Sequence, residues 1–354
     1  MISGGCDVIE SGWHAGGTGR RCSAPHWRGV GLIAAIGLTA LLGSVASAAA
    51  AAAGPPPRST PPAALTPPAA ATATAVTAAP AATAAVPRSA VPAFDHIYVV
   101  VMENHELGSI VGNRHAPYIN GLIHDYGLAT RYSAVAHPSQ PNYVALFGGA
   151  RLGVHDDSVI HLKSRSIADQ LQAAGRTWHV YAQDYPGGCS QVALRRGPVD
   201  LVGAAGTYAR RHDPAISFNP ISKHPARCAH ITDLSSFDPA AADFELIVPN
   251  LINDMHDGTI AQGDAFLRAF VPYITGSPAF ANSLLVITWD EGSTKVGGGG
   301  LVPTIVISPH VSAGYRSAVR HDHYSLLHTI QNAWGIGCLR HTCTANDLAE
   351  FFTP

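Results

Sequence analysis

The run Asn253-Asp254-Met255-His256-Asp257 places three charged or metal-ligating side chains in one short stretch. It follows the apolar residues 244–249, which predict a buried strand. In an open α/β sheet, ligands collect where the strands end. Such side chains are costly to bury unless they are paired or bind a metal. The alternative is a solvated turn that caps a helix beginning near Thr259.

Two other apolar stretches, 99–101 and 286–289, also run into charged or amide side chains. The ends of parallel strands share one edge of a sheet, so these side chains should converge there. Crowded carboxylates raise one another's pKa, and a divalent cation removes that conflict. We therefore expect one or two Mg²⁺, Mn²⁺, Ca²⁺ or Zn²⁺ ions. The candidate ligands are Glu103, Asn104, Asp254, Asp257, Asp290 and Glu291.

Ser139 is the candidate nucleophile. It lies between Pro138 and Pro141, directly before a helix predicted over 141–148. There its hydroxyl would lie beside backbone N–H groups and the positive end of the helix, which favour an anion. A serine hydroxyl needs a base or a metal to become a nucleophile. The alternative role for Ser139 is a helix cap.

Four histidines and one arginine complete the candidate site. A single histidine at a helix start is more often structural, so these residues gain weight only from the carboxylates around them. The short basic cluster 210–212 is either a solvated face or an anion site. The five candidates are His137, Arg211, His212, His256 and His323.

The composition divides the 354 residues into unequal parts. Residues 29–50 are uncharged, follow three arginines and contain Ala46-Ser47-Ala48, so residues 1–48 are predicted to be a cleaved signal peptide. The alternative is an uncleaved membrane anchor. Residues 49–92 are rich in Ala, Pro and Thr and predict a disordered linker. Residues 93–354 are expected to form one domain.

Charge and cysteine content narrow the possible classes of protein. The net charge is −2 without a block of basic residues, which argues against a nucleic-acid partner. The predicted exported part has four cysteines, an even number that favours disulfides in an oxidising compartment. Of the three possible pairings we prefer Cys189–Cys228 with Cys338–Cys343, because the second pair closes a short loop. A zinc site is the alternative.

Apolar strands alternate with helices along residues 93–354. This order predicts a three-layer α/β/α fold with a mostly parallel central sheet. The expected strands are 96–104, 129–135, 178–183, 244–249, 283–289 and 302–308. The expected helices are 116–127, 141–148, 166–174, 259–275 and 323–334, and the stretch 186–243 is expected to be irregular.

Five motifs resemble those of the phosphoesterase family of secreted acid phosphatases and non-specific phospholipases C, within the alkaline phosphatase superfamily. They are MENH (102–105), HPSQPNY (137–143), NDMHDGTIAQGDAFL (253–267), TWDEG (288–292) and HYSLLHTI (323–330). The resemblance runs from about Phe94 to about Trp334. It implies that Ser139 takes the phosphoryl group.

The resemblance also implies roles for the other candidates. Glu103, Asn104, Asp290 and Glu291 correspond to the ligands of one metal. A second group of residues corresponds to a region that holds a second metal in wider members of the superfamily: Asp254, His256, Asp257 and His323. Arg211-His212-Asp213-Pro214 corresponds to an Arg/Lys-His-x-Pro motif that lies near the bound phosphate in this family.

Together these observations predict an exported acid phosphatase that hydrolyses phosphate monoesters, phosphoinositides among the candidates, through a metal-activated serine and a phosphoserine intermediate. We expect His256 or His323 to protonate the leaving oxygen, and His137, Arg211 and His212 to contact the phosphate. The substrate would be a phosphorylated small molecule or a lipid headgroup. The protein itself would lie close to a membrane or cell wall. The oligomeric state is left open. The alternatives are a phospholipase C-type phosphodiesterase and a non-catalytic exported calcium-binding protein.

Overall fold

The computed structural model describes residues 90–199 and 205–352. The predicted signal peptide and nearly all of the predicted linker lie outside the described residues. Within the described ranges, no helix is both long and apolar enough to cross a membrane.

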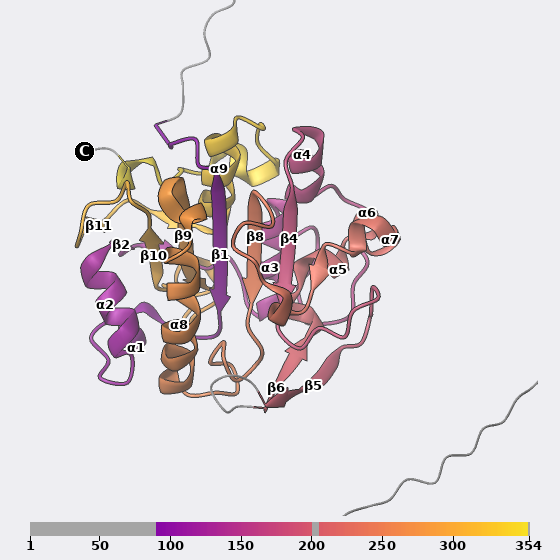
Figure 1. Cartoon of the computed structure of the whole chain (residues 1–354), viewed down its shortest axis with the longest axis horizontal. Coiled ribbons are helices and arrows are strands. Elements are labelled where there is room, and N and C mark those ends of the chain that lie inside the picture. Colours follow the sequence, from indigo (N-terminus) through magenta and orange to yellow (C-terminus); the bar gives the residue numbers. More distant parts are fainter. Residues whose placement is uncertain (1–89, 200–204, 353–354) are drawn as a thin grey trace, which may run out of the picture. The chain divides into compact units, whose positions relative to one another are not determined.

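An eight-stranded sheet forms the centre of the described domain (Figure 1). Its strands are β1 (His96–Met102), β2 (Gly127–Ala129), β4 (Trp178–Ala182), β7 (Ile231–Thr232), β8 (Phe244–Val248), β9 (Ser283–Trp289), β10 (Thr304–Ile307) and β11 (Arg316–Ser317). The order across the sheet is β11-β2-β10-β9-β1-β8-β4-β7. Strands β9, β1, β8, β4 and β7 are parallel, and β10 runs antiparallel to both of its neighbours. The prediction of a mostly parallel sheet is confirmed.

Helices cover both faces of this sheet, as the three-layer prediction requires. Helix α8 lies in front of β1 and β9 in the view of Figure 1, whereas α3 lies behind the sheet. Helix α2 packs beside α8, and α3 packs beside α9 and α4. The helices of these two layers are α2 (Pro117–Asp125), α3 (Ser139–Gly148), α4 (Ile167–Ala173), α8 (Ile260–Thr275) and α9 (His323–Trp334).

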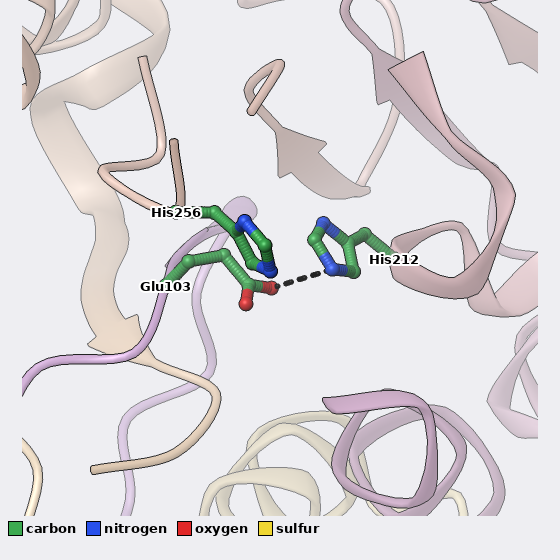
Figure 2. A group of neighbouring side chains, drawn as sticks. All are labelled: Glu103, His212 and His256. Carbon is green, nitrogen blue, oxygen red and sulfur yellow. Dashed lines mark ion pairs between the residues drawn. The ribbon is translucent and has the colours of Figure 1, made fainter. Parts of the chain in front are cut away.

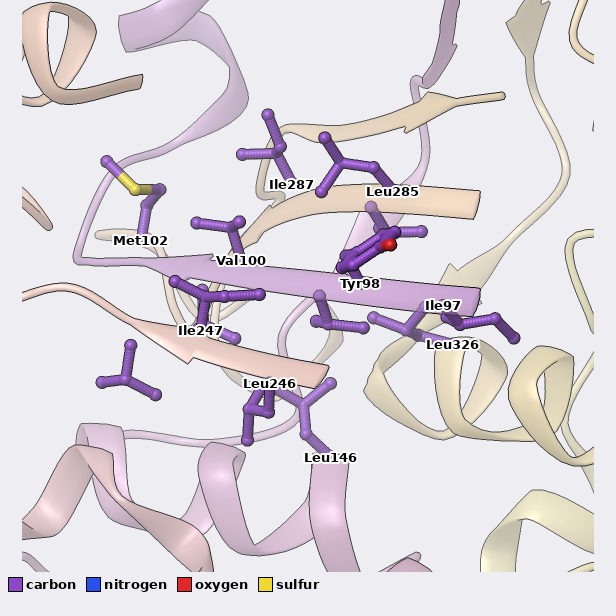
Figure 3. Packing of buried hydrophobic residues seen from close by; sticks show 14 of the residues in the cluster. Ile97, Tyr98, Val100, Met102, Leu146, Leu246, Ile247, Leu285, Ile287 and Leu326 are labelled. Carbon is purple, nitrogen blue, oxygen red and sulfur yellow. The ribbon is translucent and has the colours of Figure 1, made fainter. Parts of the chain in front are cut away.

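The core explains why the central strands are continuously apolar. Every residue of β8 and β9, and all of β1 after His96, is buried, because both faces of these strands are covered. Figure 3 shows Leu146 of α3 and Leu326 of α9 on one side of the sheet, near Leu246 and Ile97. Burying each such side chain stabilises the fold by about 1.5–3 kcal/mol.

Three sequence expectations differ from the structure. The strand expected over 129–135 is divided between β2 and the short β3 (Tyr132–Ser133), which pairs with β12 (His321–Asp322). Helix α3 begins at Ser139 rather than at Pro141, because a proline without an N–H is tolerated anywhere in a first turn. The stretch expected to be irregular contains the hairpin β5 (Leu194–Val199) and β6 (Ala205–Ala209), and also α5 (Pro214–Ser217), α6 (Asn219–Ser222) and α7 (Pro225–Cys228).

Both preferred disulfides are present. Cys189 is bonded to Cys228, and Cys338 is bonded to Cys343. The first joins the chain just before β5 to the end of α7, so it closes the region between β4 and β7 into a covalent loop.

Candidate active site

The carboxyl ends of three adjacent strands bring the predicted acidic residues together. Strands β9, β1 and β8 are parallel neighbours, so the residues that follow them lie at one edge of the sheet. Backbone bonds hold these ends in register: Glu103 N donates to Asp254 O at 2.8 Å, and Asp290 N donates to Met102 O at 2.9 Å. Glu103, Asp254 and Asp290 are fully buried. The predicted convergence is therefore present.

Ser139 is the first residue of α3, and its side chain contacts the acidic residues at this edge of the sheet. Pro138 is the N-cap residue, so the Ser139 side chain is not used as a helix cap. Its hydroxyl lies 3.1 Å from Glu103 Oε2 and 3.4 Å from Glu291 Oε1. A buried hydroxyl at a helix N-terminus, in contact with two carboxylates, is placed to act as a nucleophile.

Burial without a compensating cation raises the pKa of four carboxyl groups at this edge. Burial and then the Asp290 carboxylate raise the pKa of Glu103 well above its usual range. Burial and then Glu291 raise the pKa of Asp290 to about 8. Burial also raises the pKa of Asp254 well above its usual range, and it raises the pKa of Glu291. A cation would reverse these shifts.

Two histidines complete a group with metal-ligand spacing. Ligand atoms of Glu103, His212 and His256 all lie within 4.8 Å of one another (Figure 2). His212 Nε2 is 3.3 Å from Glu103 Oε1, and its Nδ1 is 3.5 Å from Asp254 Oδ2. Burial and the neighbouring Arg211 lower the pKa of His212 well below its ordinary value, so the ring is neutral. A neutral imidazole is the form that ligates metals.

Within the described residues, the buried atoms around this group leave hydrogen-bonding capacity unused. Both ring nitrogens of His212, Oδ2 of Asp254 and Oδ2 of Asp290 make no hydrogen bond of acceptable geometry there, although the His212 nitrogens lie 3.3 and 3.5 Å from carboxyl oxygens. Such orphaned polar atoms are expensive and demand an explanation. A divalent cation would satisfy them, so these residues fit the expected metal.

His256 is oriented by the residue that follows it. Its Nδ1 lies 2.7 Å from Asp257 Oδ1 and so carries the proton, which leaves a lone pair on Nε2. That nitrogen accepts from Arg211 Nη2 at 3.1 Å. The Asp257 side chain is about half exposed, at 55%. Asp257 contacts Nδ1 of His256, the ring nitrogen that would not bind the metal, as carboxylates behind metal-bound histidines do.

His323 and His137 are brought to the site, but protein atoms engage both of their ring nitrogens. His323 Nε2 lies 2.6 Å from Asp290 O, and Tyr132 Oη lies 3.1 Å from Nδ1. Burial lowers the pKa of His323 to about 4. His137 contacts Glu291 through Nδ1, and its Nε2 lies 2.7 Å from Thr294 O. In this geometry His323 contacts the backbone of Asp290, and His137 contacts the carboxylate of Glu291.

Tyr143 is a site residue that the sequence reasoning did not assign. Its buried hydroxyl donates to Glu103 Oε1, and its ring stacks on His212 with centroids 5.1 Å apart. The sequence contained a signal for Tyr143, because a residue four positions after Ser139 on a helix lies on the same face.

Asn104, a predicted ligand, also lies at this acidic edge. Its backbone N donates to Asp290 Oδ1 at 3.2 Å, and its Nδ2 donates to Glu103 Oε2 at 3.3 Å.

Comparison with known proteins shows which protein family the chain belongs to. Residues 109–337 match the Phosphoesterase family, and the chain belongs to this family. It is 34% identical over 258 residues to the phosphatidylinositol-3-phosphatase of Mycobacterium tuberculosis, covering 70% of this chain and 79% of that protein. The family expected from the motifs is thereby confirmed.

A second relative is more distant. The chain is 26% identical over 269 residues to an acid phosphatase of Aspergillus fumigatus, covering 72% of this chain and 58% of that protein. Both relatives are named as phosphatases, which agrees with the predicted class of enzyme. Among solved structures, a putative sulfatase from Bacteroides thetaiotaomicron has a TM-score of 0.50 at 12% identity, over 73% of this chain and 74% of the other. That likeness concerns the fold alone.

Proposed function

We propose that this chain is an exported phosphoric monoester hydrolase of the acid phosphatase type that uses Ser139 as its nucleophile. The observation that carries the proposal is the Ser139 hydroxyl, buried at the N-terminus of α3 and 3.1 Å from Glu103 in a set of carboxyl groups with raised pKa. Clustered perturbed groups around a potential nucleophile are typical of active sites.

A divalent cation is part of the proposal. Glu103, His212 and His256 would hold it, with Asp254 and Asp290 beside them. A cation bound there would lower the pKa of the serine hydroxyl and offset charge on the phosphoryl oxygens. His256 becomes a ligand in this scheme rather than a proton donor, because Asp257 fixes its proton on the far nitrogen.

The covalent steps use residues of the chain. Ser139 Oγ forms a bond to phosphorus while the bond between phosphorus and the alcohol oxygen breaks. The serine proton passes to Glu291, 3.4 Å away, and from there to the departing alcohol. Water then attacks the phosphoserine, the bond between phosphorus and Oγ breaks, and one proton of the water returns to Ser139 as phosphate leaves.

The charge of the transferring group is met by groups already in place. The Arg211 guanidinium and the N–H of Gln140 in the first turn of α3, which now donates to Asp157 Oδ1 at 2.9 Å, would contact the phosphoryl oxygens. Arg211 is held by His256 at 3.1 Å and lies 3.7 Å from Asp157 Oδ2. Phosphate would replace His256 and Asp157 as partners of the guanidinium, and its oxygens can accept from Arg211 in a bidentate arrangement.

The proposal is tested with p-nitrophenyl phosphate and the Ser139→Ala variant. We expect wild-type hydrolysis, loss of nearly all activity in the variant, and an unchanged circular dichroism spectrum. Acid quenching during turnover should trap phosphate on the peptide that contains Ser139. Full activity of Ser139→Ala would exclude the covalent scheme. Faster hydrolysis of bis(p-nitrophenyl) phosphate would instead favour the phosphodiesterase.

Export is a separate part of the proposal. The two disulfides in the described domain are typical of an oxidising compartment. Expression of the full chain should yield extracellular protein that begins at Ala49, as N-terminal sequencing would show. Retention of residues 1–48 in a membrane fraction would favour the anchor.

A further inference from the structure

The carboxylate of Asp157 lies against the two donors that would bind the substrate phosphate. Its Oδ1 accepts from Gln140 N in the first turn of α3 at 2.9 Å. Its Oδ2 lies 3.7 Å from Arg211 Nε, which is beyond hydrogen-bond distance. That buried Nε makes no hydrogen bond within the described residues, so the guanidinium keeps a donor for a better-placed acceptor. Asp157 therefore stands where phosphoryl oxygens would bind, but it satisfies only one of the two donors.

The segment that carries Asp157 is tethered at this place. The buried side chain of Gln140 donates from Nε2 to Asp156 O at 2.9 Å and to Ser158 O at 2.7 Å. These two carbonyls belong to the residues on either side of Asp157, so they hold its backbone over the N-terminus of α3. A tethered group acts at a high effective concentration, and a carboxylate held in this way can compete with a free anion in solution.

The surroundings of Asp157 allow its carboxylate to leave these donors without disturbing the core. Its side chain is 36% exposed, and residues 155–159 are all exposed. Gln140, Asp157 and Arg211 also line a cavity of about 150 Å³, so the two donors face open space rather than packed side chains. A small anion can therefore reach them once the carboxylate rotates away.

We propose that Asp157 is a built-in competitor of phosphate, which keeps the affinity of the site low and limits inhibition by the product. This inference rests on the proposed function and specifies how ligand binding at that same site is regulated. The apparent affinity of a ligand falls in proportion to the fraction of molecules whose site is free to bind it. Each phosphate that binds must displace the Asp157 carboxylate, and the returning carboxylate displaces inorganic phosphate after hydrolysis.

The test measures inhibition of the full chain by inorganic phosphate, with p-nitrophenyl phosphate as the substrate. Asp157→Asn keeps an acceptor for Gln140 N but removes the charge, so we expect the inhibition constant of phosphate to fall roughly tenfold. Asp156→Asn is the matched control, because it removes the same charge from the adjacent exposed residue, whose Oδ1 accepts from Ser158 N at 2.9 Å. This control should keep the wild-type inhibition constant.

Asp157→Ala separates competition with phosphate from stabilisation of the helix end. It removes both the charge and the acceptor, so the inhibition constant should fall as in Asp157→Asn, whereas the Tm should fall in Asp157→Ala alone because Gln140 N loses its acceptor. An unchanged inhibition constant in Asp157→Asn would leave Asp157 with a structural role only and overturn the inference. A fall of equal size in Asp156→Asn would assign the effect to net charge and also overturn it.

Calorimetric titration of inorganic phosphate repeats the comparison without turnover. The proteins are the full-length Ser139→Ala variant and the double variant Ser139→Ala/Asp157→Asn, and the double variant should bind phosphate roughly tenfold more tightly. Equal affinities would overturn the inference while leaving the phosphatase intact. Absence of p-nitrophenyl phosphate hydrolysis by the wild type would instead contradict the proposed function.

Discussion

Ser139 and Tyr143 lie one helical turn apart on α3, and both donate to the carboxylate of Glu103. Tyr143 donates to Oε1 and Ser139 to Oε2. One helix face therefore positions the proposed nucleophile and also fixes the acidic side chain that it contacts. The same tyrosine ring stacks on His212, so a second candidate ligand is held by the same residue.

Tyr143→Phe should lower kcat about 10- to 100-fold, since partners behind metal ligands typically contribute that much to activity or metal affinity. The phenyl ring keeps the stacking on His212 and removes only the hydroxyl. Steady-state kinetics and metal titration would measure both effects. Tyr98→Phe is the matched control, because that buried hydroxyl donates to Pro239 O away from the site. Equal effects of the two variants would count against a specific role for Tyr143.

Removal of the metal should abolish activity and lower the Tm. Without a cation, Asp290 and Glu103 face one another as carboxyl groups whose pKa is raised by burial. Exhaustive chelation followed by return of Mg²⁺, Mn²⁺, Ca²⁺ or Zn²⁺, with elemental analysis, would identify the metal. His212→Phe should bind less metal and stay folded. Full activity of metal-free protein would rule out the metal role.

Arg211→Ala should raise KM and the inhibition constant of inorganic phosphate roughly 10- to 100-fold, the usual range for loss of a hydrogen bond to a charged group. Arg211→Lys should restore part of this affinity, because it keeps the charge without the planar fork. Arg268→Ala is the control, since that side chain is 58% exposed on α8. If phosphate inhibits Arg211→Ala as strongly as the wild type, Arg211 does not contact the phosphate.

Glu245 should make the protein less stable as the pH rises. Burial raises the pKa of this carboxyl group from 4.5 to about 8. The folded state therefore keeps a proton that the unfolded chain releases, so the stabilisation is complete below pH 4.5 and is lost as the pH rises toward about 8. The slope is about 1.4 kcal/mol per pH unit.

Glu245→Gln removes this dependence. The variant should gain stability relative to the wild type between pH 5 and pH 8, measured by urea unfolding with the metal concentration held constant. The same difference in unfolding free energy at both pH values would contradict the assignment.

The local pattern of the sequence was enough to predict the fold class and the identity of most candidate residues. Apolar runs ending in Glu103 and Asp290 predicted parallel strands, because strands covered on both faces must be apolar throughout. The convergence of their acidic ends followed from that topology alone. The five motifs also predicted the phosphoesterase family, which the comparison confirmed.

Only the tertiary structure decided what each of these side chains contacts. The sequence offered His323 beside His256 as a proton donor and His137 as a phosphate contact. In the structure, Tyr132 and Asp290 engage the ring nitrogens of His323, and Glu291 and Thr294 engage those of His137. The buried Arg210 likewise donates to the carbonyl of Ile160, which lies 50 residues earlier in the chain. Hydrogen-bond partners and burial come from residues distant in sequence, so a local pattern can name the chemistry of a side chain but not its neighbours.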